Sequence, residues 1–109
     1  MSVDLMFQQS RQVTAIFAAY DEIALGAWKA LNDRNLAVPK DMSLIGFDDE
    51  DYAAFTVPPL TTVRIDVEAI GNELIRLLYR KFQSPDAPHT SVKLPTMLVK
   101  RSTCWPAAP

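Results

Sequence analysis

The stretch Met42-Ser43-Leu44-Ile45-Gly46-Phe47-Asp48-Asp49 decides how this chain is interpreted, because an apolar run ends there in two carboxylates. A short apolar run between turn residues is typical of a strand buried on both faces of a parallel sheet. Ligands of open parallel sheets bind beyond the carboxyl ends of the strands. Asp48 is therefore predicted to lie where a polar ligand would be held.

The run Ala15-Ile16-Phe17-Ala18-Ala19-Tyr20-Asp21 has the same pattern and also ends in an acid. We predict buried strands over residues 13–19 and 42–48, joined by a helix that starts at Asp21 as its N-cap. Asn35 can take the left-handed conformation that ends such a helix. Together these elements form one βαβ unit, so the expected class is α/β with a mainly parallel sheet flanked by helices.

After this unit, a strand is predicted over residues 57–64, because two prolines force an extended entry and a β-branched run follows. Asp66 is predicted to cap a second helix over residues 66–83 with an apolar stripe at helical spacing. Residues 92–95 and 96–101 are predicted as short closing strands. A turn of helix is expected around Tyr52 and Phe55, and the tail of an amphipathic helix over residues 1–12.

Composition narrows the functional class. The 109 residues, 49% of them hydrophobic, allow one domain at most or a piece of a larger one, and the net charge of −2 gives no electrostatic case for nucleic-acid binding. The single cysteine, Cys104, cannot form an internal disulfide, which favours the cytoplasm. No leader or bilayer-spanning run is present, so we expect an intracellular, soluble protein without membrane contact.

Three ordered segments resemble one protein family. They are Thr14 to Asp21 followed by Ala24-Leu25-Gly26-Ala27, then Val38 to Asp49, then Pro58-Pro59-Leu60-Thr61-Thr62-Val63. Together with the ending Leu98-Val99-Lys100-Arg101-Ser102-Thr103, they resemble the C-terminal part of the LacI/GalR family of bacterial transcription regulators. Members of this family have a DNA-binding headpiece and a two-lobed core like the periplasmic sugar-binding proteins, which binds an effector and dimerises.

The resemblance implies a single partial domain over residues 1–109. Residues 13–63 and 96–103 would form the sheet and helix of the C-terminal lobe (type I periplasmic-binding-protein-like), and the helix 66–83 would belong to the N-terminal lobe. The expected function is effector sensing and dimerisation in such a regulator, with no catalysis and no cofactor or metal. DNA would be contacted only through the headpiece, for which this chain has no room.

The resemblance also assigns residues. Asp48 matches the family aspartate that accepts hydrogen bonds from effector hydroxyl or ring N–H groups, and a carboxylate suits that role because each oxygen takes more than one donor. The other expected effector contacts are Tyr20 and Asp21. Tyr20 stands where members usually carry Asn, so its phenol could stack on a sugar or a nucleobase-like effector, or partly fill the pocket. The residues that match the dimer contact are Leu25, Trp28, Tyr52 and Phe55.

The acids after the strand and Trp28 each have a second interpretation. Asp48 could be a capping or solvated acid, and the run Asp48-Asp49-Glu50-Asp51 could serve metal or phosphoryl chemistry, although adjacent acids on a turn rarely converge on an ion. Asp49 is expected to act as a cap or to fix the loop and not to contact a ligand. Trp28 could be a core residue, and the Lys100-Arg101 pair is expected on the surface. A receptor component of a sugar transport system is the alternative function, and a small phosphoryl-transfer enzyme is a third.

Overall fold

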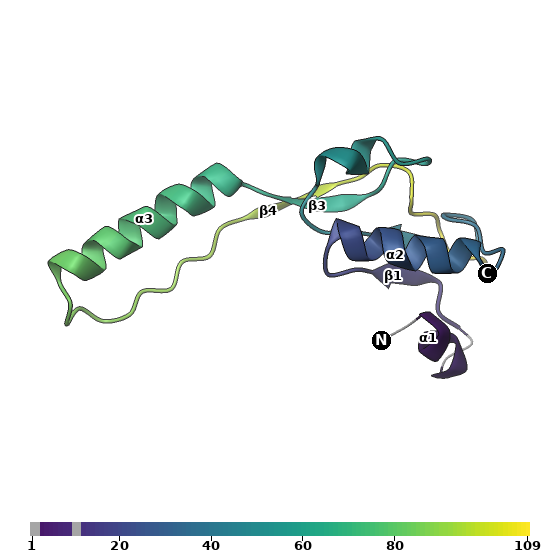
Figure 1. Cartoon of the computed structure of the whole chain (residues 1–109), viewed down its shortest axis with the longest axis horizontal. Coiled ribbons are helices and arrows are strands. Elements are labelled where there is room, and N and C mark those ends of the chain that lie inside the picture. Colours follow the sequence, from purple (N-terminus) through teal and green to yellow (C-terminus); the bar gives the residue numbers. More distant parts are fainter. Residues whose placement is uncertain (1–2, 10–11) are drawn as a thin grey trace. The chain divides into compact units, whose positions relative to one another are not determined.

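The computed structural model describes residues 3–9 and 12–109. Its elements follow the order α, β, α, β, 3-10 helix, β, α, β (Figure 1). They are α1 (Val3–Gln9), β1 (Ala15–Phe17), α2 (Asp21–Asn32), β2 (Ser43–Ile45), η1 (Asp51–Ala54), β3 (Thr62–Ile65), α3 (Val67–Gln83) and β4 (Thr96–Val99). This order confirms the predicted βαβ unit and the long second helix.

The chain divides into two compact units. Unit 1 comprises Met1–Arg64 and Leu98–Pro109, and unit 2 comprises Ile65–Met97. Unit 1 is thus built from two separate stretches of chain, because the whole of unit 2 lies between them in sequence.

The sheet of unit 1 is parallel at its centre. β1 pairs with β2 in the register Ala15↔Ser43, Ile16↔Leu44 and Phe17↔Ile45. On the other side of β2, Ile45 forms a parallel bridge with Thr61, and the Gly46 N–H donates to the Thr61 carbonyl at 2.9 Å. β3 pairs with β4. The ladder brings the ends of β1, β2 and the residues entering β3 to one edge.

The strands are shorter than the sequence predicted. β2 is mostly buried as expected, but Phe17 of β1 is 67% exposed, so the prediction that this strand is buried on both faces is wrong. β1 pairs only with β2 in its sheet, so its other edge has no neighbouring strand among the described residues. The predicted strand over residues 92–95 does not form, since β4 begins only at Thr96, after Pro95, which has no N–H to donate.

The core of unit 1 lies between α2 and the sheet. Ala24, Trp28 and Leu31 recur at helical spacing on one face of α2 and are buried together with Leu44 and Leu60. Asn35, with a φ of 58°, follows the end of the helix in the predicted left-handed conformation. The packing of α2 fixes its first turn over the edge where β1 and β2 end.

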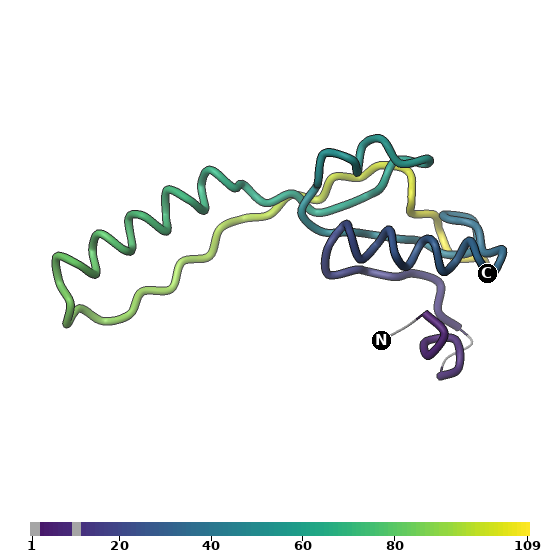
Figure 2. Tube along the Cα trace, in the orientation of Figure 1, coloured from purple at the N-terminus to yellow at the C-terminus, as the bar shows by residue number. Residues whose placement is uncertain are grey.

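Unit 2 is a helix with an extended segment returning beside it (Figure 2). Asp66 caps α3 as predicted, because its carboxylate accepts from the Ala69 N–H at 2.9 Å. Of the described residues in Ile65–Met97, none is buried. The exposed apolar side chains of the helix include Leu74, Ile75, Leu78, Tyr79 and Phe82. None of the described helices is long and apolar enough to cross a membrane.

Candidate functional site

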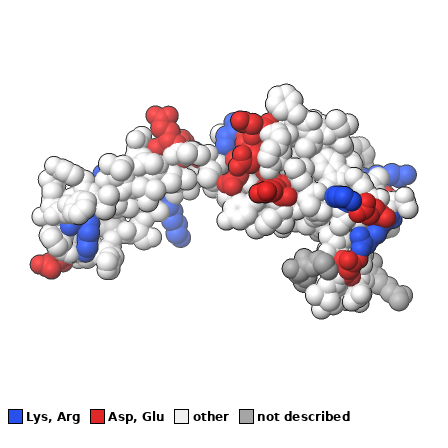
Figure 3. All heavy atoms as spheres, in the orientation of Figure 1, with Lys and Arg blue, Asp and Glu red and all other residues white. Residues whose placement is uncertain are grey.

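A hollow of about 530 Å³ opens at the carboxyl ends of β1 and β2 in unit 1. We call it the acidic hollow. Its lining residues are Tyr20, Asp21, Glu22, Leu25, Asp48, Glu50 and Tyr52. Figure 3 shows acidic side chains gathered on the visible face of unit 1. Four of the lining residues are acidic and none is basic, so the wall favours ligands that offer hydrogen-bond donors.

The structure brings together most of the residues singled out from the sequence. Tyr20, Asp21 and Asp48, the predicted effector contacts, line the hollow together with Leu25 and Tyr52 from the predicted dimer set. Tyr20 is 54% exposed. The remaining two predicted dimer residues lie elsewhere.

Those two residues differ sharply from each other. Trp28 is 9% exposed and belongs to the core, the alternative left open by the sequence, whereas Phe55 is 82% exposed just after η1. A part for Trp28 in a dimer contact stays a prediction. Phe55 presents an apolar ring at the surface, as an interface residue would.

The loop that carries Asp48 has an unusual backbone. Asp48 has a φ of 107° and Asp49 a φ of 53°, both in the region that glycine favours. The Asp48 N–H donates to the Val63 carbonyl at 2.9 Å. No hydrogen bond or ion pair involves the Asp48 side chain in the described part of the chain, so its carboxylate is available to a ligand.

Asp21 has a different place from the one predicted. α2 begins at Asp21 with Tyr20 as the N-cap residue, so the prediction that Asp21 caps the helix is wrong. Its buried carboxylate instead accepts from the Thr62 hydroxyl at 2.6 Å and from the Glu50 N–H at 2.8 Å. Each of the two carboxylate oxygens thus accepts a hydrogen bond from a residue that is distant in sequence. Asp21 therefore ties α2 to the loop and to β3.

Gly46 makes this arrangement possible. A Cβ built on Gly46 would lie 2.0 Å from Oδ1 of Asp21, far inside contact distance. The close approach of the β2 end to the Asp21 carboxylate thus requires glycine at this position.

Asp49 fixes the loop from its other side, as predicted. Its carboxylate accepts from Nε of Arg64 and from Nη2 of Arg101, each at 2.7 Å. Burial alone would raise the pKa of Asp49, but the hydrogen bonds and charges of the two guanidinium groups outweigh it, so the pKa lies below the ordinary 3.8. Arg101 also donates to the Leu60 carbonyl at 3.0 Å.

Sequence reasoning missed Thr62, Arg64 and Arg101. The prediction that the Lys100-Arg101 pair lies at the surface is wrong for Arg101, whose side chain is only 17% exposed. Its partner Asp49 is far away in sequence, so no local pattern indicates the contact. The one available signal was the strand-end acid Asp49, whose side chain required a partner once buried.

The electrostatics of the hollow also affect Tyr52. Burial raises the pKa of its phenol, and the negative charges of Asp21 and Glu50, followed by those of Glu22 and Asp48, raise it further. The phenol is therefore protonated at neutral pH and can donate a hydrogen bond. Among the described residues, no group of three or more His, Cys, Asp or Glu side chains could hold a metal ion.

Comparison with known proteins places this geometry in a family. Residues 2–104 match the model of the periplasmic binding protein-like domain. The chain is 46% identical over 94 residues to the HTH-type transcriptional regulator MalR of Streptomyces coelicolor, covering 85% of this chain and 27% of that protein.

Solved structures agree. A LacI family transcriptional regulator from Enterococcus faecalis V583 with bound ribose superposes with a TM-score of 0.73 at 33% identity, over 85% of this chain and 35% of that chain. The Lac repressor dimer bound to operator and the anti-inducer ONPF superposes with a TM-score of 0.71 at 37% identity, over 84% and 32%.

The chain belongs to the periplasmic binding protein-like domain family, in the form that LacI/GalR-type transcription regulators carry. It spans less than a third of the length of the MalR relative. The relatives are named as regulators of transcription and not as enzymes.

Proposed function

We propose that this chain is the effector-sensing and dimerisation part of a LacI/GalR-type transcription regulator that works in the cytoplasm without catalysis. The observation that carries the proposal is the acidic hollow at the strand ends, with the unpartnered Asp48 carboxylate on its wall. A regulator of this kind changes its DNA affinity because effector binding alters the populations of two lobe arrangements. DNA contact belongs to a headpiece outside these residues.

The effector we infer is a small molecule with several hydrogen-bond donors, such as a neutral sugar or a nucleobase-like ring. Asp48 would accept two donors, as carboxylates do with adjacent hydroxyls. Tyr20 would stack on a sugar or base face, since its ring is largely exposed. A phosphorylated effector is disfavoured, because no basic side chain lines the hollow to balance its charge.

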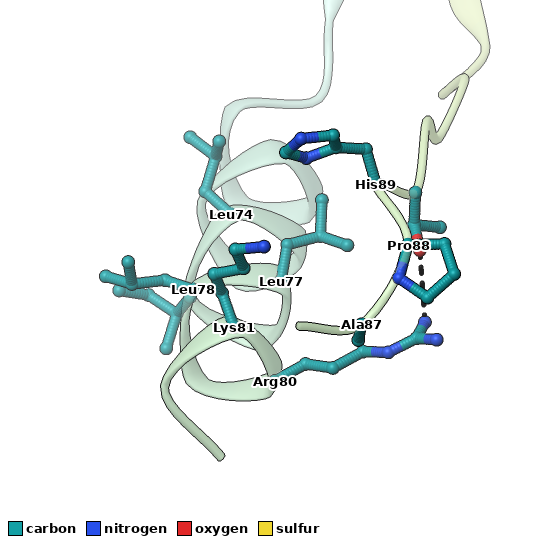
Figure 4. A pocket seen from close by; sticks show the side chains of 10 residues that line it. Leu74, Leu77, Leu78, Arg80, Lys81, Ala87, Pro88 and His89 are labelled. Atoms are coloured by element: carbon teal, nitrogen blue, oxygen red, sulfur yellow. Dashed lines mark hydrogen bonds between the residues drawn. The ribbon is translucent and has the colours of Figure 1, made fainter. Parts of the chain in front are cut away.

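We assign the two units to different lobes of the complete protein. Unit 1 would be the C-terminal lobe, and α3 of unit 2 would pack in the N-terminal lobe. A groove of about 500 Å³ supports this, as it lies between α3 and the returning segment and is lined largely by apolar side chains (Figure 4). Leu77 points toward the segment that carries Pro88 and His89, whereas Leu78 points away from it.

Dimerisation would use the surface around Leu25, Tyr52 and Phe55. Phe55 and the neighbouring Val57 are 82% and 91% exposed, and aromatic side chains are enriched at protein–protein interfaces. The operator-bound relative is a dimer, which supports the same assembly here.

Calorimetric titration of the complete gene product tests the effector site. The probes are ribose, cellobiose, adenine and ribose 5-phosphate, with Asp48→Ala as the variant. We expect a neutral probe to bind and the variant to weaken that binding at least about tenfold, or about 1.4 kcal/mol.

The matched control is Asp51→Ala, an exposed acid in η1 that does not line the hollow. Its affinity should equal that of the wild type. Unchanged affinity in Asp48→Ala would remove Asp48 from the site, and preferential binding of the phosphorylated probe would contradict the inferred effector class.

The lobe assignment has its own test. Sedimentation velocity of the 109-residue chain should show association that Leu74→Glu with Leu78→Glu reduces, because both side chains are mainly exposed here. In the complete gene product the same double change should instead lower stability, since α3 would be buried there. A 109-residue chain that stays monomeric at high concentration with both leucines intact would argue against the assignment.

A further inference from the structure

The loop from Asp48 to Glu50 adopts a backbone that its sequence disfavours. Two consecutive residues with a side chain have positive φ, and such conformations persist only where the surroundings determine them. Neither Asp48 nor Asp49 is a glycine that would take this geometry without cost. Something outside the loop must therefore hold it.

Three neighbouring backbone amides supply the anchorage. The Asp48 N–H donates to the Val63 carbonyl at 2.9 Å, the Asp49 N–H to the Thr62 hydroxyl at 3.3 Å, and the Glu50 N–H to Oδ2 of Asp21 at 2.8 Å. Two of these acceptors are side-chain atoms of buried residues. The loop is thus fixed by partners on β3 and on the first turn of α2.

Thr62 is the centre of this network. Its hydroxyl donates to Oδ1 of Asp21 at 2.6 Å while accepting from the Asp49 amide, and the residue is fully buried. A hydroxyl can donate and accept at once, which neither a methyl group nor a carboxylate can do here. Removing it would leave a buried carboxylate oxygen and a backbone N–H without partners.

The network holds the backbone and leaves the Asp48 side chain free. Both oxygens of Asp21 and both of Asp49 are hydrogen-bonded: Asp21 accepts from Thr62 and Glu50, and Asp49 accepts from two arginines. Asp48 directly precedes Asp49 in sequence, and its own carboxylate has no partner in the described residues.

We infer that Thr62 and Asp21 are positioning residues that lock the Asp48–Glu50 loop so that the Asp48 carboxylate faces the acidic hollow. What Asp48 then binds rests on the proposed function. Asp21 acts through the loop backbone and not by contact with the effector, which assigns it a role different from the one expected from the resemblance.

Nuclear magnetic resonance of the 109-residue chain tests the lock directly. A strong intraresidue NOE between the amide proton and Hα marks positive φ, and amide exchange reports the hydrogen bond of Asp49. In Thr62→Val, which keeps the shape but lacks the hydroxyl, we expect the NOEs of Asp48 and Asp49 to weaken. The Asp49 amide should exchange at least about tenfold faster, because a lost hydrogen bond raises local opening.

Two matched variants control this experiment. Thr62→Ser keeps the hydroxyl and should preserve both signals. Thr56→Val removes a hydroxyl that donates to the Ala53 and Pro58 carbonyls outside the network, so the loop should not respond. Unchanged NOEs and exchange in Thr62→Val, with the Leu44 amide still protected, would overturn the inference.

Should Thr62→Val lose the protection of the Leu44 amide, Asp21→Asn provides the second measurement. The side-chain amide of asparagine accepts only at its oxygen, whereas both oxygens of Asp21 accept, so the contact with Thr62 or the contact with Glu50 is lost. The NOEs and amide exchange of the loop should therefore change in a folded chain. Global unfolding of both variants would show that these residues support the whole lobe and not the loop, which also overturns the inference.

Binding of ribose and cellobiose to the complete gene product separates this inference from the proposed function. If either probe binds the wild type, Thr62→Val should weaken it at least about tenfold while Thr62→Ser binds normally. If neither probe nor adenine binds the wild type, the proposed effector class fails. The loop measurements would still decide the positioning role.

Discussion

The two units differ in how far their apolar side chains are buried. Every buried hydrophobic residue of the described chain lies in unit 1, where α2 covers the parallel sheet. In unit 2 the stripe of α3 has no such cover, and Leu74 and Ile75 are 61% and 67% exposed. Both helices are amphipathic in sequence, so periodicity alone cannot tell a helix with a core from one that awaits a partner.

The largest expected effect contrasts one leucine from each unit. Leu44→Ala should lower the free energy of unfolding by about 2–5 kcal/mol, because the side chain is fully buried in β2. Leu74→Ala should change the free energy of unfolding of the monomeric chain by less than about 0.5 kcal/mol, as usual for exposed positions. Urea unfolding followed by circular dichroism measures both. Equal losses in the monomeric chain would contradict the exposed position of Leu74.

Asp49→Asn should have the next largest effect and lower the free energy of unfolding by about 2–3 kcal/mol near neutral pH. The substitution removes the charge of a mostly buried carboxylate that pairs with two arginines, of which Arg64 is half exposed. The folded pKa of Asp49 is lowered from 3.8, so its stabilisation is present above that value and is lost as the pH falls through the folded pKa.

The difference between wild type and Asp49→Asn should accordingly shrink below about pH 4. Urea unfolding at neutral and acidic pH measures it. Asp51→Asn, which changes an exposed acid nearby, is the control and should leave the stability unaltered. A difference that stays constant down to low pH would contradict the ion-pair explanation.

Asp66→Ala should lower the stability of α3 by about 1 kcal/mol, within the range for the loss of an N-cap. Because Asp66 caps α3, the loss should appear as faster amide exchange in α3 with the Leu44 amide of unit 1 unaffected. Asp66→Ser, another good cap, should restore the wild-type rates. Spread of the effect into unit 1 would show that the two units unfold as one.

The smallest effect concerns Tyr52. Its folded pKa is raised above 10, so its contribution to stability is present below that pH and lost as the pH rises through the folded value. In a titration of phenolate absorbance, Tyr52→Phe should remove a component that ionises above pH 10. Stability at neutral pH should change by less than about 0.5 kcal/mol. Loss of a component with an ordinary pKa would contradict the charged surroundings described.

Local patterns predicted much of the fold. The presence of α2, the cap at Asp66 and the left-handed Asn35 follow from residues within a turn or two of each position. Strand lengths did not, because pairing partners decide them. Asp21 shows the reason most clearly, since a good cap residue is drawn instead to partners 29 and 41 residues away.

The candidate site was predictable only in part. The strand-end position of Asp48 follows from the apolar run that precedes it, and the structure places it on the wall of the hollow. Thr62 and Arg101 gave no signal, because β-branched and basic residues near strands are common and their partners are distant in sequence. What fixes the loop could be learned only from three-dimensional contacts.

The stretch after unit 2 has a consequence for the order of events during synthesis. Thr103 is fully buried, its hydroxyl donates to the Leu44 carbonyl at 2.6 Å, and its carbonyl accepts from the Leu44 amide. Translation delivers Leu44 long before Thr103, so the nascent sheet has an unsatisfied strand while α3 is still being made. The contact between Leu44 and Thr103 can form only after Thr103 has left the ribosome, so until then this edge of β2 is open to chaperones or to a neighbouring nascent chain.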